Sequence, residues 1–355
     1  MKGLILSGGK GTRLRPLTYT SAKQLVPVAN KPVLFYGIEA LVEAGITNIG
    51  IVVGDTQAEI RAAVGDGSKF GASVTYIEQD APRGLAHAVL ISETFIAGDP
   101  FVMYLGDNLL NRGIDRFVEA FQREKPAAQI LLTKVPDPQM FGVAELKDGR
   151  VFRLVEKPKE PKSDLALVGV YMFGRDVFDS VKRIKPSFRN ELEITDAIQD
   201  LIDRGLEVRP HIVEGWWKDT GKLEDMLEAN RLILDTLERR IDGKVDDASR
   251  IEGKVVIGAG TTIERSVVRG PVIIGENVTI AGAYIGPFTS IGDRATIRET
   301  EIEHSIVLEG ATITDLANRI EDSLIGRNVS IYRLPVRPSA YRFMLGDSSE
   351  VGIRW

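Results

Sequence analysis

The last third of the chain repeats with a fixed period, and this feature limits its fold more than any other. Aliphatic residues recur every seventeen positions, at Ile257, Ile274, Ile291, Leu308 and Ile325. Glycine follows four of these five residues, and further aliphatic positions recur between them. Three apolar positions per period indicate three short strands in each turn of a coil. We therefore expect a left-handed parallel β-helix of hexapeptide repeats over residues 251–335, with a loop where the repeat slips at 313–320.

The function of such a β-helix depends on whether it holds a catalytic group. Many hexapeptide-repeat proteins are acyltransferases with a catalytic histidine, and the histidine of this region is His304. The sequence identifies no partner that would orient His304 as a base. We expect a stabilising or oligomerising module, and acyl transfer at His304 is the alternative.

The first hundred residues alternate between aliphatic runs and segments whose apolar residues have helical spacing. The runs cover residues 4–6, 49–54, 74–77 and 101–105, and the helical segments cover 32–44, 57–64 and 84–91. This alternation predicts an α/β domain with a doubly wound, mostly parallel, Rossmann-like sheet, whose ligands bind at the carboxyl ends of the strands. A helical stripe at 223–240 ends this domain. The predicted divisions are residues 1–240, a linker at 241–250, the β-helix at 251–335 and a tail at 336–355.

A glycine-rich turn, Gly8-Gly9-Lys10-Gly11, directly follows the first aliphatic run. Its backbone N–H groups can approach an anion closely, and Arg13 and Lys23 can supply charge to phosphate oxygens. Gly11 after Lys10 excludes a Walker A loop, and Leu14 stands where a dinucleotide fingerprint needs glycine. The same spacing argues against a nicotinamide oxidoreductase. The turn is either another kind of phosphate-binding loop or a tight turn beside two solvated cations.

Two isolated aspartates follow apolar or aromatic residues. Asp107 comes where the strand predicted at 101–105 ends, and Asp219 follows Trp216-Trp217-Lys218. A carboxylate at the position of Asp107 can hold a divalent cation against a triphosphate. Taken alone, Asp107 is better interpreted as a turn or helix-capping residue.

Residues 8–18 resemble the Gly-Gly-x-Gly-Thr-Arg-Leu-x-Pro-Leu-Thr signature of the sugar nucleotidyltransferases, or sugar-1-phosphate pyrophosphorylases. The match continues through Ser21-Ala22-Lys23-Gln24, whose Lys-Gln pair is similar to that of the thymidylyltransferase branch. Residues 191–196 are similar to the family's Glu-Leu-Glu-Ile-Thr-Asp. The likeness extends over nearly the whole of the branch's long form, in which a pyrophosphorylase domain precedes a β-helix and a short tail.

The resemblance implies transfer of a nucleotidyl group from dTTP to α-D-glucose-1-phosphate, with release of pyrophosphate and help from Mg²⁺. It implies catalytic roles for Arg13, Lys23 and Lys157, and metal ligation by Asp107 and Asp219. The nucleotide-binding residues that it implies are Leu6, Gly8, Gly9, Gly11, Thr12, Arg13, Gln24, Gln79, Pro82 and Gly84. The sugar-phosphate-binding residues that it implies are Gly142, Glu156, Lys157 and Val168.

Several alternatives stay open beside this assignment. UTP is an alternative nucleotide, because uracil lacks only a methyl group that is worth ~1–3 kcal/mol. Another sugar, such as N-acetylglucosamine-1-phosphate, and a second acyltransferase activity in the β-helix are further alternatives. An inactive regulatory subunit is disfavoured, because the charged residues of the motif are present.

Composition and hydropathy exclude several kinds of binding partner and of cellular location for this protein. The net charge of −5 argues against a nucleic-acid-binding surface, and the absence of cysteine excludes disulfides and cysteine-based sites. No apolar stretch approaches the ~20 residues of a membrane span, and the N-terminus does not resemble a signal peptide. We therefore expect a cytoplasmic homo-oligomer with small-molecule substrates.

Overall fold

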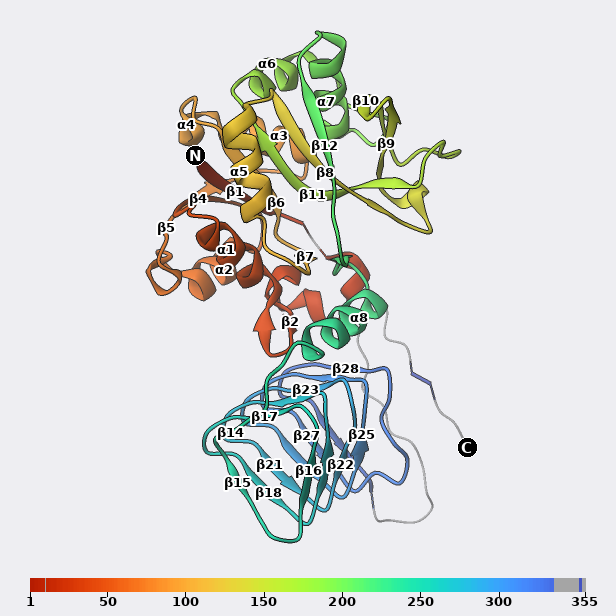
Figure 1. Ribbon diagram of the computed structural model, residues 1–355. Coiled ribbons are helices and arrows are strands. Elements are labelled where there is room, and N and C mark those ends of the chain that lie inside the picture. Colours follow the sequence, from red (N-terminus) through yellow and green to blue (C-terminus); the bar gives the residue numbers. More distant parts are fainter. Residues whose placement is uncertain (10, 335–350, 353–355) are drawn as a thin grey trace. The chain divides into compact units, whose positions relative to one another are not determined.

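The computed structural model describes residues 1–9, 11–334 and 351–352 (Figure 1). Contacts divide the chain into two compact units. The first contains the N-terminal strand and Val33–Asp219, and the second contains Gly11–Pro32 and the chain from Thr220 onward. The expected domain at 1–240 thus contributes two of its segments to the second unit. Of the predicted tail at 336–355, all but residues 351 and 352 lie outside the described residues.

The parallel part of the first unit's sheet comes from the first hundred residues, as predicted. Its strand order is β6-β1-β4-β5, and all of these pairs are parallel. The strands are β1 (Lys2–Ser7), β4 (Asn48–Val53), β5 (Ser73–Glu78) and β6 (Phe101–Leu105). The helices of this part are α1 (Val33–Glu43), α2 (Gln57–Val64), α3 (Leu85–Ile91) and α4 (Glu93–Ile96), and η4 (Ser68–Phe70) is a short 3₁₀ turn. The runs in β1, β4 and β6 are buried on both faces of the sheet, which is why they are nearly continuous. The run in β5, at the edge of the sheet, is only partly buried.

The sheet continues in antiparallel pairs beyond β6. Strand β11 pairs antiparallel with β6, β8 and β9, and β12 runs parallel to β8. The strands are β8 (Ala128–Lys134), β9 (Gly142–Lys147), β10 (Arg150–Glu156), β11 (Leu165–Phe173) and β12 (Val208–Ile212). The helical elements are α5 (Asp115–Glu124), η5 (Pro138–Met140), α6 (Asp176–Arg183) and α7 (Ile194–Asp203), and a separate pair is formed by β7 (Asn108–Leu110) and β13 (Trp217–Asp219). A shared aliphatic core joins this half to the parallel part.

The second unit contains a left-handed parallel β-helix, as the seventeen-residue repeat predicts (Figure 1). Three sheets of short parallel strands form its described part, around a core of stacked aliphatic residues. One sheet contains β14 (Arg240–Ile241), β17 (Val255–Ile257), β20 (Val272–Ile274), β23 (Thr289–Ile291), β26 (Ile306–Val307) and β28 (Leu324–Ile325). Another contains β15 (Lys244–Val245), β18 (Thr262–Glu264), β21 (Thr279–Ala281), β24 (Thr296–Arg298), β27 (Thr312–Thr314) and β29 (Ser330–Tyr332). The last contains β16 (Arg250–Glu252), β19 (Val267–Arg269), β22 (Tyr284–Ile285) and β25 (Glu301–Ile302).

Two details of the repeat differ from the prediction. Residues 241–250 are not a linker but part of the first coil, because Ile241 and Val245 pair with the next coil. Leu308 does not continue the stack, because Ile291 pairs with Val307, which in turn pairs with Ile325. Coils of sixteen and eighteen residues therefore follow one another, and the extra length falls at 315–319, where the loop was expected.

The remaining elements of the second unit belong to the N-terminal segment Gly11–Pro32 and to the helix that precedes the β-helix. They are η1 (Thr12–Leu14), η2 (Leu17–Tyr19), η3 (Lys23–Leu25), the hairpin β2 (Pro27–Val28) and β3 (Lys31–Pro32), and α8 (Leu223–Leu234). Helix α8 is shorter than the predicted 223–240, because Arg240 already belongs to the β-helix. In the described part of the chain, no helix has the length and apolarity that crossing a membrane requires.

Candidate functional site

A pocket of about 130 Å³ opens at the carboxyl ends of β1, β4 and β5. It brings together six residues that the sequence nominated for nucleotide binding, and adds Glu191 from a distant segment. The lining residues are Leu6, Gly8, Gly9, Val52, Gln79, Pro82, Gly84, Ala88 and Glu191. Ligands of open α/β sheets bind at this edge.

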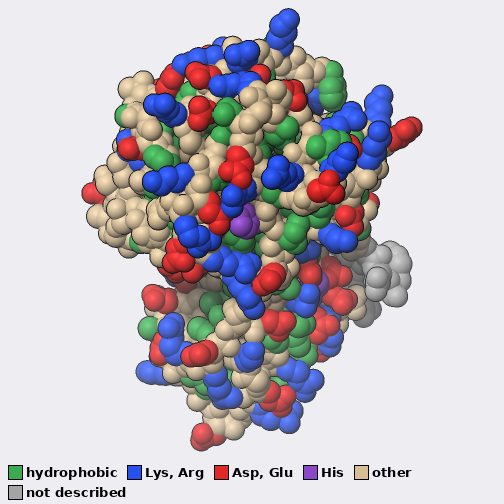
Figure 2. Space-filling view, turned by 45° about the horizontal axis from the view of Figure 1, so that its top comes forward, with side chains coloured by type: hydrophobic (Ala, Val, Ile, Leu, Met, Phe, Trp, Pro, Cys, Tyr) green, Lys and Arg blue, Asp and Glu red, His purple; other side chains and the backbone are tan. Residues whose placement is uncertain are grey.

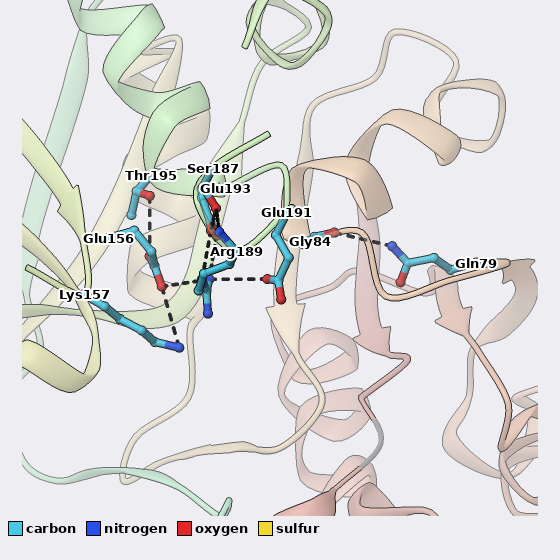
Figure 3. Close-up of polar contacts among 9 residues, drawn as sticks. All are labelled: Gln79, Gly84, Glu156, Lys157, Ser187, Arg189, Glu191, Glu193 and Thr195. Atoms are coloured by element: carbon cyan, nitrogen blue, oxygen red, sulfur yellow. Dashed lines mark hydrogen bonds and ion pairs between the residues drawn. The ribbon is translucent and has the colours of Figure 1, made fainter. Parts of the chain in front are cut away.

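The side-chain amide of Gln79 has a defined orientation in this pocket. Its Nε2 lies 3.4 Å from the carbonyl oxygen of Gly84 and 3.0 Å from Nδ1 of His87 (Figure 3 shows the Gly84 contact). Because a carbonyl can only accept, the nitrogen donates to Gly84, and Nδ1 of His87 also accepts. Burial, and then the charge of Arg83, lower the pKa of His87, which favours this neutral imidazole. Oε1 of Gln79 lies on the side of Gly8, 3.2 Å from where a Cβ atom at that glycine would stand.

Gly84 is required by both conformation and space. Its φ is +99°, and an added Cβ would stand 2.4 Å from the carbonyl oxygen of Leu192. The backbones on either side are hydrogen-bonded, with Leu192 N donating to Arg83 O (2.8 Å) and Ala86 N donating to Leu192 O (3.0 Å). The loop that carries Gln79 and Gly84 is thereby fixed to the segment 187–193.

The predicted sugar side lies around the hairpin of β9 and β10. Glu156 is paired with Gly142 across this hairpin, and Lys157 follows it with a positive φ of 42°. Nζ of Lys157 is 4.0 Å from Oε1 of Glu156, and Oγ1 of Thr195 donates to Oε2 at 3.4 Å (Figure 3). Burial, and secondarily the charge of Glu193, raise the pKa of Glu156. A Cβ atom on Gly142 would stand 2.7 Å from Cγ2 of Thr195, so a larger residue would displace this group.

Arg189 links the nucleotide pocket to this sugar side, and the sequence did not indicate it. Its guanidinium donates to the buried Glu193 at 2.7 and 3.0 Å. The same group lies 3.3 Å from Glu191 and 3.4 Å from Glu156 (Figure 3). The hydrogen bonds to Glu193 and the surrounding carboxylates raise the pKa of Arg189. The only available signal was its position two residues before the motif that begins at Glu191.

The two predicted metal ligands are brought together by a short sheet. Strand β13 pairs antiparallel with β7, which places Asp219 opposite Asn108, the neighbour of Asp107. Asn108 donates to Asp107 (2.9 Å) and accepts from the indole N–H of Trp217 (2.6 Å). No group of three or more candidate metal ligands occurs among the described residues. Two carboxylates fit a cation that completes its coordination with water and substrate phosphates, as Mg²⁺ does.

Five more nominated residues lie on the Gly11–Pro32 segment of the second unit. Arg13 and Thr12 are exposed in η1, and Gly11 has a φ of +61°. A Cβ atom on Gly11 would stand 2.7 Å from Cβ of Lys23, so these residues are in close contact. Gln24 is 1% exposed, and its Oε1 has no hydrogen-bond partner within the described residues. A buried acceptor without a partner is costly, and a ligand can satisfy it.

Two further nominated positions have different surroundings. Val168 is completely buried, where the pairing of β11 with β8 is interrupted between Leu167 and Tyr171. His304 does have a partner, contrary to expectation, because its Nδ1 contacts the carboxylate of Asp322. The two side chains are 32% and 67% exposed, which is typical of a solvated surface contact.

The charged surface is mixed on the face shown in Figure 2. Lys and Arg side chains are interspersed with Asp and Glu over that face. A nucleic-acid-binding surface typically concentrates its positive side chains in one stripe or patch. The mixture of signs agrees with the net charge of −5.

Comparison with known proteins gives matches along the whole chain. The family model described as Nucleotidyl transferase matches residues 2–236. A glucose-1-phosphate thymidylyltransferase of Streptomyces antibioticus is 57% identical and covers 100% of both chains. One from Streptomyces griseus is 54% identical over 99% of each. The crystal structure of a putative glucose-1-phosphate thymidylyltransferase from Bacillus anthracis, in complex with a sucrose, matches with a TM-score of 0.62 and 39% identity, over 65% of this chain and 94% of that one.

Proposed function

Because this chain belongs to the nucleotidyl transferase family, we propose that it transfers a thymidylyl group from dTTP to α-D-glucose-1-phosphate. The products are dTDP-glucose and pyrophosphate. The observation that supports this most directly is the pocket in which Gly8, Gly9, Gln79 and Gly84 meet. We further propose that the chain works as a homo-oligomer.

In the proposed reaction an oxygen of the sugar phosphate attacks the α-phosphorus of dTTP, and pyrophosphate leaves in line. Positioning and neutralisation of charge account for most of the catalysis of such a transfer. The backbone at Gly8, Gly9 and Gly11 holds the triphosphate, and Lys23 binds the α-phosphate. Arg13 stabilises the charge that develops on the leaving pyrophosphate.

On the sugar side, Lys157 holds the phosphate of glucose-1-phosphate, and Glu156 accepts hydrogen bonds from sugar hydroxyls. Gly142 and Val168 line the sugar pocket, and the missing side chain of Gly142 lets Thr195 and Glu156 approach closely. On the nucleotide side, Oε1 of Gln79 accepts from the N3–H of thymine. Leu6, Thr12, Gln24, Pro82 and Gly84 complete the proposed nucleotide contacts.

Enzymes of this family generally use a divalent metal, and we propose Mg²⁺ held by Asp107 and Asp219. Bound there, the cation would neutralise phosphate charge and orient the reacting groups. The pairing of β7 with β13 supports this, because it sets Asp219 opposite Asn108, the neighbour of Asp107.

The activity is tested by measuring pyrophosphate release with Mg²⁺. Each of dTTP, UTP, GTP, ATP and CTP is combined with glucose-1-phosphate, N-acetylglucosamine-1-phosphate and other sugar-1-phosphates. We expect the highest kcat/KM with dTTP and glucose-1-phosphate. A higher value with UTP and N-acetylglucosamine-1-phosphate would replace this assignment by the related one, and no release with any pair would refute nucleotidyl transfer.

Replacing His87 by leucine is expected to lower the preference for dTTP over CTP about fivefold. The variant removes one of the two acceptors that hold Nε2 of Gln79, and one neutral hydrogen bond is worth ~1 kcal/mol. The amide can then turn its donor toward N3 of cytosine, which accepts where thymine donates. The measurement is the ratio of kcat/KM for the two nucleotides, with His304→Leu as the control. An unchanged ratio would contradict the role given to His87.

Binding of glucose-1-phosphate is expected to weaken as the pH falls. The weakening should begin at a higher pH than it would if Glu156 had the pKa of an exposed glutamate. Burial raises the pKa of Glu156 above 4.5, so its carboxylate is lost earlier on acidification. A protonated carboxyl accepts hydrogen bonds poorly, and the KM for the sugar phosphate should therefore rise. Glu156→Gln should have a high KM for the sugar phosphate, without the rise on acidification that comes from protonation of Glu156. Glu145→Gln should behave like the wild type. The sugar phosphate itself titrates near pH 6 in all three enzymes, so identical pH profiles would contradict the prediction.

A further inference from the structure

The amide of Asn230 joins the N-terminal basic segment to the β-helix within the second unit. Asn230 lies in α8 and is completely buried. Its Oδ1 accepts from the backbone N–H of Ala29 and from the hydroxyl of Ser290, both at 2.9 Å. Its Nδ2 donates to the carbonyl oxygen of Phe288 at 3.0 Å. One side chain thus connects the β2–β3 hairpin with a coil of the β-helix.

The hairpin turn makes a second attachment to the same coil. Nδ2 of Asn30 donates to the carbonyl oxygen of Ile291 at 2.7 Å. Ala29 and Asn30 both have positive φ values, 48° and 61°, as the central residues of a two-residue hairpin turn do. Alanine is an unfavourable residue for this conformation, so the contact with Asn230 helps to define the turn.

The earlier part of the segment also contacts the β-helix. A Cβ atom on Gly326 would stand 3.3 Å from Cδ2 of Leu17, which places the Leu17 side chain against that coil. Figure 1 shows β2 beside α8, and both β2 and β23 are in contact with this helix. The segment Gly11–Pro32 is therefore attached to the β-helix near its middle and near its end.

This segment carries Arg13, Lys23 and Gln24. We propose that the β-helix is the support that positions these groups for thymidylyl transfer, and that Asn230 is the positioning residue through which it acts. The proposal rests on the proposed function, and it assigns the β-helix a part in that reaction beyond stabilisation or assembly. Small displacements of a phosphate-binding group reduce the rate strongly, by as much as 10²-fold for about 1 Å.

The test compares three variants of the full chain. Asn230→Leu keeps the approximate volume and removes all three hydrogen bonds. Asn30→Ala removes the bond to Ile291 and also puts alanine at a positive φ of 61°. The control is Thr261→Val, because Thr261 is equally buried and bonds to Gly275 and Val278 within the β-helix. Neither contact of Thr261 involves the segment 11–32.

We expect Asn230→Leu to lower kcat with dTTP about ten- to hundredfold, and Asn30→Ala to lower it less. The KM for glucose-1-phosphate should stay within about twofold, because Glu156 and Lys157 belong to the first unit. Thr261→Val should lower the melting temperature while keeping the kcat. An unchanged kcat in a folded Asn230→Leu variant, or an equal loss in Thr261→Val, would overturn the proposal. If Asn230→Leu does not fold, an unchanged kcat in Asn30→Ala would overturn the proposal.

Hydrogen exchange of the backbone amides measures how firmly the segment 11–32 is held by the β-helix, independently of activity. In Asn230→Leu, and more weakly in Asn30→Ala, amides of residues 11–32 should exchange faster than in the wild type and in Thr261→Val. Unchanged exchange there would overturn the proposal even if the enzyme is active. If the wild type releases no pyrophosphate, the proposed function fails, and faster exchange would still support the attachment that the inference describes.

Discussion

An Arg13→Ala variant is expected to lose about 10²–10³-fold in kcat for thymidylyl transfer. Arg13 is exposed in η1, on the segment that also carries Lys23. In the proposed reaction its guanidinium stabilises the pyrophosphate as negative charge develops on it. This interaction grows in the transition state, so its loss should lower kcat more than it raises the KM for dTTP.

The matched control for this variant is Arg15→Ala. Arg15 is also exposed and lies two residues away, where its guanidinium packs 4.7 Å from the ring centroid of Tyr19. The Arg15→Ala variant removes the same formal charge from the same segment. Its kcat therefore measures any general electrostatic effect of losing a positive charge there. Steady-state pyrophosphate release with dTTP and glucose-1-phosphate distinguishes the two variants. Equal losses in both, or a kcat of Arg13→Ala close to that of the wild type, would contradict the role of Arg13.

The elements that depend on local pattern were predicted closely from the sequence. Helix α2 has the predicted bounds, and β6 covers the predicted aliphatic run. Most coils follow the seventeen-residue repeat. Hydrophobic period and turn residues determine such features over a few neighbouring positions.

The features that were missed depend on contacts between distant residues. Arg189 matters through its contact with Glu156, which lies 33 positions away in the sequence. His87 matters through its contact with Gln79, which no hydrophobic period indicates. The polar residues 241–250 belong to a coil that departs from the period of seventeen, because Ile241 pairs with Ile257 and Val245 with Ile263. The attachment of Ala29 to Asn230 spans 201 positions, so no local pattern could have indicated it.

The pairing of β7 with β13 leads to the other large expected effect. Asp107 and Asp219 are 112 positions apart in sequence, yet the register sets Asp219 opposite the neighbour of Asp107. Asn108 and Trp217 hydrogen-bond across the same pair, so the backbone position does not depend on either carboxylate alone. A neutral amide should therefore occupy either position without disturbing the local fold, while supplying less charge to a bound cation.

Asp107→Asn and Asp219→Asn are each expected to lower kcat about 10²–10³-fold at a fixed Mg²⁺ concentration. The Mg²⁺ concentration that gives half of the maximal rate should rise in both, because an amide oxygen is a weaker ligand for this hard cation than a carboxylate. Asp115→Asn at the start of α5 is the control, since it removes an acid outside this pair. Rates are measured across a Mg²⁺ titration, and melting temperatures confirm that the variants are folded. A lower kcat with an unchanged Mg²⁺ requirement would mean that these acids act by positioning the substrate rather than by holding the metal.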